Sequence, residues 1–300
     1  MSQDHDWGLR LQLFVSKSDV PIVLSALDRY LPDSYQGRPV RFAFTGQQAT
    51  RLGIDVTTPT KFAHDRLGFD PTRSVTTSDW LSLSGQAALE VVAGEVFRDQ
   101  VGELTRLRQA LTWYPDDIWR YVVACDWRRL DQELPLMARA GDRGDELGSR
   151  TIAARLVEIA VHLAFTLSRV WQPYSKWRGT MFSELAVAGK IARDLQTAVA
   201  ASQWQDRSDA LREALEHLAN FQSEVGLPTS SPVVVPFWDR PYLQIEQSLV
   251  TTLMDSIADP TVRELPVGLG GIDQRTDNVD VLVSPEHRSA ATVGERGPQR

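Results

Sequence analysis

Two aspartates stand one residue apart near the start of the chain, in the stretch DHDWGLRLQLFV. Asp4 and Asp6 precede alternating apolar and polar residues, a pattern typical of a half-buried strand. Residues i and i+2 of a strand point to the same face, so the two carboxylates would lie side by side. Like charges placed this way repel each other unless a cation lies between them, and Mg²⁺ prefers oxygen ligands. The pair predicts a Mg²⁺ site or, as the simpler alternative, two solvated charges.

A third carboxylate, Asp55, lies in the stretch GIDVTT between Ile54 and Val56, which would be core residues of a neighbouring strand. If Asp55 approached Asp4 and Asp6, the three would form a site for two metal ions. Such sites stabilise both the attacking and the leaving oxygen in nucleotidyl transfer. We therefore predict these three aspartates to be catalytic residues and metal ligands.

A small α/β unit must position these carboxylates. Residues 7–15 and 38–46 alternate in polarity and residues 53–58 are short and β-branched, so each range predicts a strand. Residues 18–32 predict a helix, because Pro21 suits its first turn and Pro32 ends it. The first 60 residues therefore read as strand, helix, strand, strand.

From about residue 76 the pattern is helical, with apolar residues three and four positions apart. The predicted helices cover residues 76–97, 102–114, 115–140, 144–171, 180–201, 205–226 and 242–259. Amphipathic helices must bury their apolar stripes against one another, which favours an antiparallel bundle. The fold class is therefore α+β, with a mixed sheet and helices followed by a mainly α-helical bundle.

We expect four regions along the chain. Residues 1–110 form the α/β domain and residues 111–262 the helical bundle domain. Residues 263–283 contain Asp273, Asp277 and Asp280 without the regular spacing of a calcium loop, and we interpret them as a docking segment. Residues 284–300 are polar and lack aromatic residues, so we expect a disordered tail.

A dense cluster of aromatic and cationic residues follows the strongest predicted helix, in QPYSKWRG. Lys176 could hold a phosphate and a nucleobase could stack on Trp177, with Tyr174 beside them. We predict these three residues to bind substrate. The alternative is that Tyr174 and Trp177 fill the end of the bundle while the cations are solvated.

The composition indicates which classes of binding partner and which cell compartment to expect. A net charge of -7 and a pI near 5.3 disfavour binding to long nucleic acids, whereas a small anionic substrate held through a metal is compatible with them. One cysteine, Cys125, cannot form an internal disulfide, so we expect a cytoplasmic protein. No apolar stretch is long enough to cross a membrane, and the five histidines lack metal-ligand spacing.

The acidic motifs resemble those of the polymerase-β nucleotidyltransferase superfamily, whose pattern is a Gly-Ser turn, Asp-x-Asp and one further acid. DHDWG and IDV match this pattern, and no Gly-Ser turn precedes them here. The stretches LGFDP, GDELGSR, PYSKW and IDQRTDNVDVL are similar to a bacterial domain-of-unknown-function family of nucleotidyltransferase-like proteins. The resemblance runs from about residue 4 to residue 283. It implies an α/β domain that lacks its N-terminal Gly-Ser segment.

The resemblance also implies an activity: transfer of a nucleotidyl group from a nucleoside triphosphate to a hydroxyl of a small molecule or a protein. Asp4 and Asp6 would bind Mg²⁺, and Asp55 would bind the catalytic metal. Related enzymes take a general base from the helical side, which makes Glu103, Asp116 and Asp117 candidates. The last two are more simply explained as first-turn acids of a helix. Without a Gly-Ser turn, the alternative is a catalytically inactive binding or regulatory module.

Overall fold

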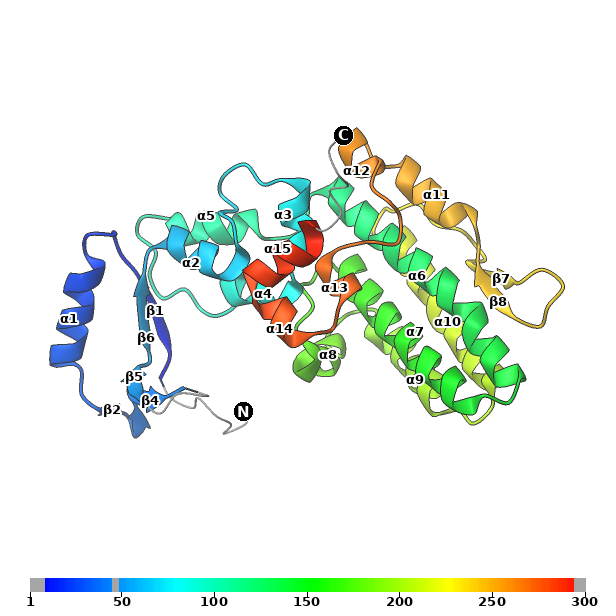
Figure 1. The fold of residues 1–300 in the computed structure, drawn as a ribbon, viewed down its shortest axis with the longest axis horizontal. Coiled ribbons are helices and arrows are strands. Elements are labelled where there is room, and N and C mark those ends of the chain that lie inside the picture. The colour runs from blue at the N-terminus through cyan, green and yellow to red at the C-terminus, as the bar shows by residue number, and fades with distance from the viewer. Residues whose placement is uncertain (1–8, 45–48, 294–300) are drawn as a thin grey trace.

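The computed structural model describes residues 9–44 and 49–293 of the 300-residue chain. An α/β unit lies at one end, and helices make up most of the remainder (Figure 1). The strands are β1 Leu11–Phe14, β2 Ser34–Tyr35, β3 Arg38–Pro39, β4 Arg41–Ala43, β5 Thr50–Leu52, β6 Ile54–Thr57, β7 Val234–Pro236 and β8 Leu243–Ile245. The fold class expected from the sequence, α+β, is confirmed at this level.

The helices fall into three groups along the chain. The first comprises α1 Val20–Tyr30, α2 Pro59–Leu67, α3 Thr77–Ser82, α4 Gly85–Val92 and α5 Glu103–Ala110. The second comprises α6 Asp116–Asp142, α7 Glu146–Leu167, α8 Ser175–Phe182, α9 Ala188–Ala200 and α10 Trp204–Glu224. The third comprises α11 Ser248–Asp255, α12 Pro260–Arg263, α13 Ile272–Arg275, α14 Val279–Val283 and α15 Pro285–Val293.

The α/β unit is built on one parallel pair of strands, β1 and β6. Helix α1 and the short antiparallel pairs β2–β3 and β4–β5 connect them. The predicted first strand, helix and last strand correspond to β1, α1 and β6, but the structure has the four short strands β2 to β5 where one strand, residues 38–46, was predicted. Phe14 of β1 packs edge-on against Phe62 of α2, with ring centroids 5.2 Å apart. This contact joins the unit to the helices, because Phe62 is buried in the main core.

The long helices α6, α7, α9 and α10 pack side by side as a bundle (Figure 1). Helix α6 starts after Pro115 with two acids, which suit the positive end of the helix dipole. Asp145 caps the start of helix α7, because its side chain accepts a hydrogen bond from the backbone N–H of Gly148 at 2.8 Å. Trp119 and Trp127 are fully buried between these helices, and both indole N–H groups find acceptors. These two tryptophans are therefore buried without leaving their indole N–H groups unsatisfied.

The predicted helix over residues 180–201 is interrupted, because its residues form the end of α8 and then, after a turn, α9. Two other predicted helices also differ from the structure. Residues 76–97 form the separate helices α3 and α4, because Ser84 caps α4 by accepting a hydrogen bond from the N–H of Ala87. Residues 242–259 begin as strand β8, which pairs antiparallel with β7, and only then form α11. In both places local hydrogen bonds end the helix that the apolar spacing had predicted.

The end of the chain also differs from the prediction of a disordered tail over residues 284–300. Residues 285–293 form helix α15, which packs against α3 and α14. Arg288 is fully buried there and donates hydrogen bonds to the backbone oxygens of Arg66 at 2.7 Å, Ser82 at 3.0 Å and Leu282 at 2.7 Å. A guanidinium group can satisfy carbonyls at several helix ends at once, and polar composition alone does not reveal this role.

Candidate functional site

Among the predicted metal ligands, Asp55 lies on the described part of β6, and Asp4 and Asp6 lie outside the described residues. The side chain of Asp55 is exposed. In the parallel ladder Asp55 is the partner of Gln12, which stands six positions after Asp6 in the sequence.

Asp55 lines a wide cavity, with a volume of about 1590 Å³, that we call the Asp55 cavity. Its walls come from both parts of the molecule: β1 and β6 on one side, and residues 93–104 with α5 on the other. Glu103, the predicted general base, lines the same cavity and is exposed. Arg98 also lines it and forms no hydrogen bond or ion pair with residues 9–44 or 49–293. Asp55, Glu103 and Arg98 are thus among several acidic and basic residues that line this cavity.

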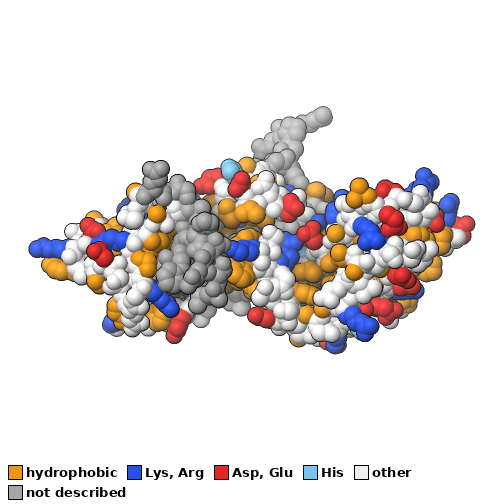
Figure 2. Space-filling model, turned by 90° about the horizontal axis from the view of Figure 1, so that it is seen from below, with side chains coloured by type: hydrophobic (Ala, Val, Ile, Leu, Met, Phe, Trp, Pro, Cys, Tyr) orange, Lys and Arg blue, Asp and Glu red, His pale blue; other side chains and the backbone are white. Residues whose placement is uncertain are grey.

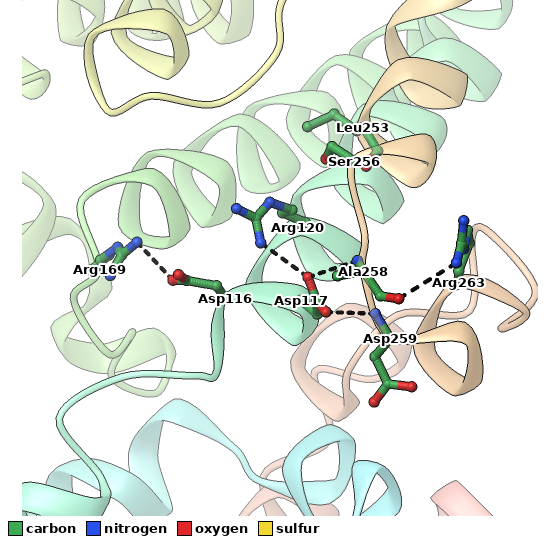
Figure 3. Close-up of polar contacts among 9 residues, drawn as sticks. All are labelled: Asp116, Asp117, Arg120, Arg169, Leu253, Ser256, Ala258, Asp259 and Arg263. Carbon is green, nitrogen blue, oxygen red and sulfur yellow. Dashed lines mark hydrogen bonds and ion pairs between the residues drawn. The ribbon is translucent and has the colours of Figure 1, made fainter.

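The other two candidate bases, Asp116 and Asp117, are engaged in structural contacts (Figure 3). Asp116 forms an ion pair with Arg169 at 3.0 Å. Asp117 accepts hydrogen bonds from the backbone N–H groups of Asp259 at 2.8 Å and Ala258 at 3.2 Å. Burial raises the pKa of Asp117, but these two bonds and the neighbouring arginine outweigh it and hold the pKa below its ordinary value. Asp117 therefore ties the start of α6 to the segment after α11.

The predicted substrate-binding residues are close in sequence but differ in surroundings. Trp177 is 43% exposed, and the Nζ atom of Lys176 lies 5.6 Å from its ring centroid. Tyr174 is half-buried, and its N–H donates to Gln86 at 3.3 Å. Tyr174 lines a second cavity, and neither Lys176 nor Trp177 does. Since Asp55 lines the first cavity only, the structure does not bring Tyr174 and Asp55 into one site.

The second cavity, which we call the His162 cavity, lies among α6, α7, the start of α8 and the segment after α12, and its volume is about 350 Å³. It is lined by Gln86, Arg129, Gln132, Glu133, Arg155, Glu158, Ile159, His162, Gln172, Pro173, Tyr174, Arg178, Asp273, Gln274, Arg275, Thr276, Asp277 and Leu282. Most of these side chains are polar or charged. Ligand cavities in proteins commonly start at about 300 Å³, so the space admits a small molecule.

A buried hydrogen-bond network forms one wall of the His162 cavity. The Nδ1 atom of His162 lies 2.6 Å from the Oδ2 atom of Asp126, which has no exposed side-chain surface. The Nε2 group of Gln274 donates to the Oδ1 atom of Asp126 at 2.6 Å and to the backbone oxygen of Val122 at 2.9 Å. A carboxylate can only accept, so Nδ1 of His162 carries a hydrogen and Nε2 remains for other contacts.

A second carboxyl group, Asp273, reaches the same cavity from the chain's C-terminal segment. It accepts a hydrogen bond from the backbone N–H of Gly85 at 2.7 Å. Loss of hydration raises the pKa of Asp273, although electrostatic interactions with His162 and Arg178 and the hydrogen bond from Gly85 offset part of this effect. A Cβ atom on Gly85 would lie 2.3 Å from the backbone oxygen of Gln172, so glycine allows these segments to approach closely.

Sequence reasoning missed this site because its parts are far apart along the chain. The signal that it left was a stripe of polar residues on two otherwise apolar helices: Asp126, Arg129 and Glu133 on α6, and Arg155, Glu158 and His162 on α7. Each set repeats at helical spacing, so its members share a face. Polar residues at such spacing on a buried face predict a lined cavity, provided that the partner helix is known.

Cys125 is not a candidate nucleophile. It is fully buried, and burial raises the pKa of its thiol to about 11. A thiol with this pKa stays protonated near neutral pH, so Cys125 serves as a small core residue, as its sequence context predicts.

Within the described residues, no three or more His, Cys, Asp or Glu side chains are grouped so that they could hold a metal ion. The same residues include no helix that is both long and apolar enough to cross a membrane. Acidic and basic side chains are interspersed over the bundle face that Figure 2 shows, and neither sign forms a continuous patch there.

Comparison with known proteins identifies one family. Residues 80–178 match the model of a domain of unknown function, DUF4037. The match contains the α6 and α7 walls of the His162 cavity, and Asp55 and Gln274 lie outside it. No curated protein matches the chain. No solved structure matches it either.

Proposed function

We propose that this chain is a cytoplasmic, Mg²⁺-dependent nucleotidyltransferase that moves a nucleotidyl group from a nucleoside triphosphate to a hydroxyl acceptor. The observation that carries the proposal is the position of Asp55. Its exposed carboxylate lies on β6, beside the strand that follows the Asp4-x-Asp6 motif, and lines a cavity of about 1590 Å³. Both the α/β unit and the helices line this cavity, as a site that closes over its substrate requires.

In this proposal Asp4, Asp6 and Asp55 hold the metal ions. Asp55 fits this role because its exposed carboxylate offers oxygen ligands, the type that Mg²⁺ prefers. The bound metal would neutralise charge that develops on the transferred phosphate. Arg98 would bind phosphate oxygens of the triphosphate, and Glu103 would accept the proton of the acceptor hydroxyl.

One observation favours a second candidate, a non-catalytic binding or regulatory module derived from the same fold. The ladder places Asp55 opposite Gln12 and not opposite the Asp4-x-Asp6 motif. A protein that had lost catalysis could keep the cavity and the α/β unit while its acids no longer converge. The two candidates differ in whether Asp55 is needed for chemistry.

The test is a transfer assay with the full chain, Mg²⁺ and each of the four nucleoside triphosphates labelled at the α-phosphate. Label should pass to an acceptor, and Asp55→Asn should lower the rate about 100-fold, because a metal ligand contributes several kcal/mol to the transition state. Asp33→Asn is the matched control: its side chain is 98% exposed and lies outside the cavity. Absence of transfer with every nucleotide would reject catalysis and leave the binding module.

A further inference from the structure

The His162 cavity is separate from the Asp55 cavity, because no residue lines both. Its walls carry basic and acidic side chains together. Four arginines, Arg129, Arg155, Arg178 and Arg275, and four carboxyl groups, Glu133, Glu158, Asp273 and Asp277, line it. Two of the opposite pairs are already in contact: Arg155 with Glu133, and Arg178 with Glu158 at 3.2 Å. A ligand of this cavity therefore meets cationic and anionic groups together.

Two buried polar atoms of the cavity lining have no hydrogen-bond partner among the described residues. They are the Oε1 atom of Gln172 and the Nε group of Arg178. Gln172 is 9% exposed and the side chain of Arg178 is 17% exposed, so neither is well served by bulk solvent. A buried polar atom without a partner costs free energy, and native proteins rarely leave one unexplained. The Oε1 atom of Gln172 requires a hydrogen-bond donor, and the Nε group of Arg178 requires an acceptor.

Another part of the cavity lining is fixed in position by hydrogen bonds. The Asp126 carboxylate holds the His162 ring through Nδ1. Gln274, which lies in the C-terminal segment, donates a hydrogen bond to the same carboxylate. Nε2 of His162 has no partner among residues 9–44 and 49–293, and His162 lines the cavity. A ring fixed in this way offers a polar contact whose geometry is set before a ligand binds.

We infer that the His162 cavity binds a small zwitterion of the amino-acid class, with its carboxylate at Arg178 and its ammonium group at Gln172 and Glu158. The ligand's carboxylate accepts from the unpartnered Nε group of Arg178, and a guanidinium fork matches a carboxylate in shape. Its ammonium group donates to the unpartnered Oε1 atom of Gln172 and faces the Glu158 carboxylate. Both unsatisfied atoms thereby gain partners of the required kind.

A purely anionic ligand fits the same lining less well. A phosphate ester would gain contacts with the arginines, but it would also approach four carboxyl groups without a cation of its own. A simple amine has no carboxylate, so it would leave the Nε group of Arg178 without an acceptor. Only a ligand that carries both a positive and a negative charge matches both the arginines and the carboxyl groups of the lining.

The test uses the full chain and isothermal titration calorimetry with each of the twenty free L-amino acids as a probe. At least one should bind, and its deaminated carboxylate and its decarboxylated amine should each bind at least about tenfold more weakly, because each lacks one charged contact. Glycerol 3-phosphate distinguishes the anionic alternative: tighter binding of this probe than of any amino acid would overturn the proposal. Failure of all twenty amino acids to bind would also overturn it.

Two variants locate the bound amino acid. Arg178→Gln should weaken binding of the amino acid at least about tenfold, and Glu158→Gln should do the same through the ammonium group. Glu158 is 57% exposed on the helix surface, so its replacement leaves folding intact. Arg193→Gln is the control, since Arg193 is exposed on α9 and does not line the cavity. Unchanged affinity in both cavity variants would contradict the assignment.

Discussion

The Nδ1 atom of His162 lies 2.6 Å from the Oδ2 atom of Asp126, a carboxylate without exposed surface in the middle of α6. Gln274, 148 positions further along the chain, donates to the other oxygen of the same carboxylate at 2.6 Å. Arg129 lies 3.7 Å from it. This one side chain therefore connects α6, α7 and α13, and it fixes the wall of the His162 cavity.

Replacing the buried carboxylate should destabilise the protein strongly. Asp126→Ala leaves the donor groups of His162 and Gln274 buried without an acceptor, so we expect a loss of about 3 kcal/mol in the free energy of unfolding. Asp126→Asn keeps one acceptor oxygen and should cost less. Urea denaturation followed by circular dichroism measures both losses. Equal stability of Asp126→Ala and the wild type would show that the network contributes nothing.

Helix α15 should be required for stability, although its sequence has the composition of a disordered tail. Arg288 is buried and satisfies backbone oxygens of Arg66, Ser82 and Leu282. Arg288→Ala removes these donors, and we expect it to lower the free energy of unfolding by at least about 2 kcal/mol. His287→Ala, at an exposed neighbouring position, should change it by less than about 0.5 kcal/mol. A similar effect of both variants in thermal unfolding would rule out a special role for Arg288.

Asp273 should make stability depend on pH in one direction. Loss of hydration raises the pKa of Asp273 above its ordinary value of 3.8, and the Gly85 N–H and nearby cations offset only part of this rise. The folded protein therefore keeps the proton at pH values where the unfolded chain has lost it. As the pH rises from about 4 through the folded pKa, this carboxyl group therefore lowers the free energy of unfolding.

The variant Asp273→Asn cannot lose a proton, so its free energy of unfolding should increase relative to the wild type between pH 4 and pH 7. Urea midpoints at the two pH values give the difference. A difference for Asp273→Asn that is the same at both pH values would contradict the expected titration.

Asp117 should behave in the opposite way. Although burial raises its pKa, hydrogen bonds from the backbone N–H groups of Asp259 and Ala258 lower the pKa overall. Its ionised form thus stabilises the folded state above the unfolded pKa of about 4, and this contribution is lost as the pH falls through the folded pKa. Asp117→Asn should cost about 1 kcal/mol at pH 7 and less at pH 3.

Asp116 provides the matched control for Asp117, because the two acids are adjacent in the first turn of α6. The side chain of Asp116 is 60% exposed and forms one ion pair with Arg169 (Figure 3). Exposed ion pairs contribute little, so Asp116→Asn should change the free energy of unfolding by less than about 0.5 kcal/mol. If the two variants had equal effects at pH 7, helix-dipole placement alone would account for both acids.

The sequence was sufficient for elements whose signal is local. Alternation predicted β1, a short β-branched stretch predicted β6, and apolar spacing predicted α6, α7 and α10 close to their observed bounds. It was insufficient where a distant segment decides the outcome. Helix α15 forms because Arg288 finds carbonyls more than 200 positions away, and the β7–β8 pair forms from residues that resemble a proline-rich connection and a helix start.

For the candidate sites too, the sequence was sufficient where the signal is local and insufficient where distant segments meet. Asp55 could be singled out because one acid between apolar residues on a short strand is visible in the sequence. The His162 cavity could not, because Asp126, His162 and Asp273 come from three separate elements and meet only through tertiary packing. The sequence placed Asp273 in a docking segment and gave no signal that Asp126 and His162 would meet it.

The central claim is that Asp55 takes part in nucleotidyl transfer, and pyrophosphate release measures this most directly. We expect the full chain to release pyrophosphate from at least one nucleoside triphosphate in Mg²⁺ and to stop when the metal is chelated. We expect Asp55→Asn to slow the release about 100-fold and Asp33→Asn to leave it unchanged. Release at the wild-type rate by Asp55→Asn, or none by the wild-type chain with any of the four nucleotides, would contradict the account.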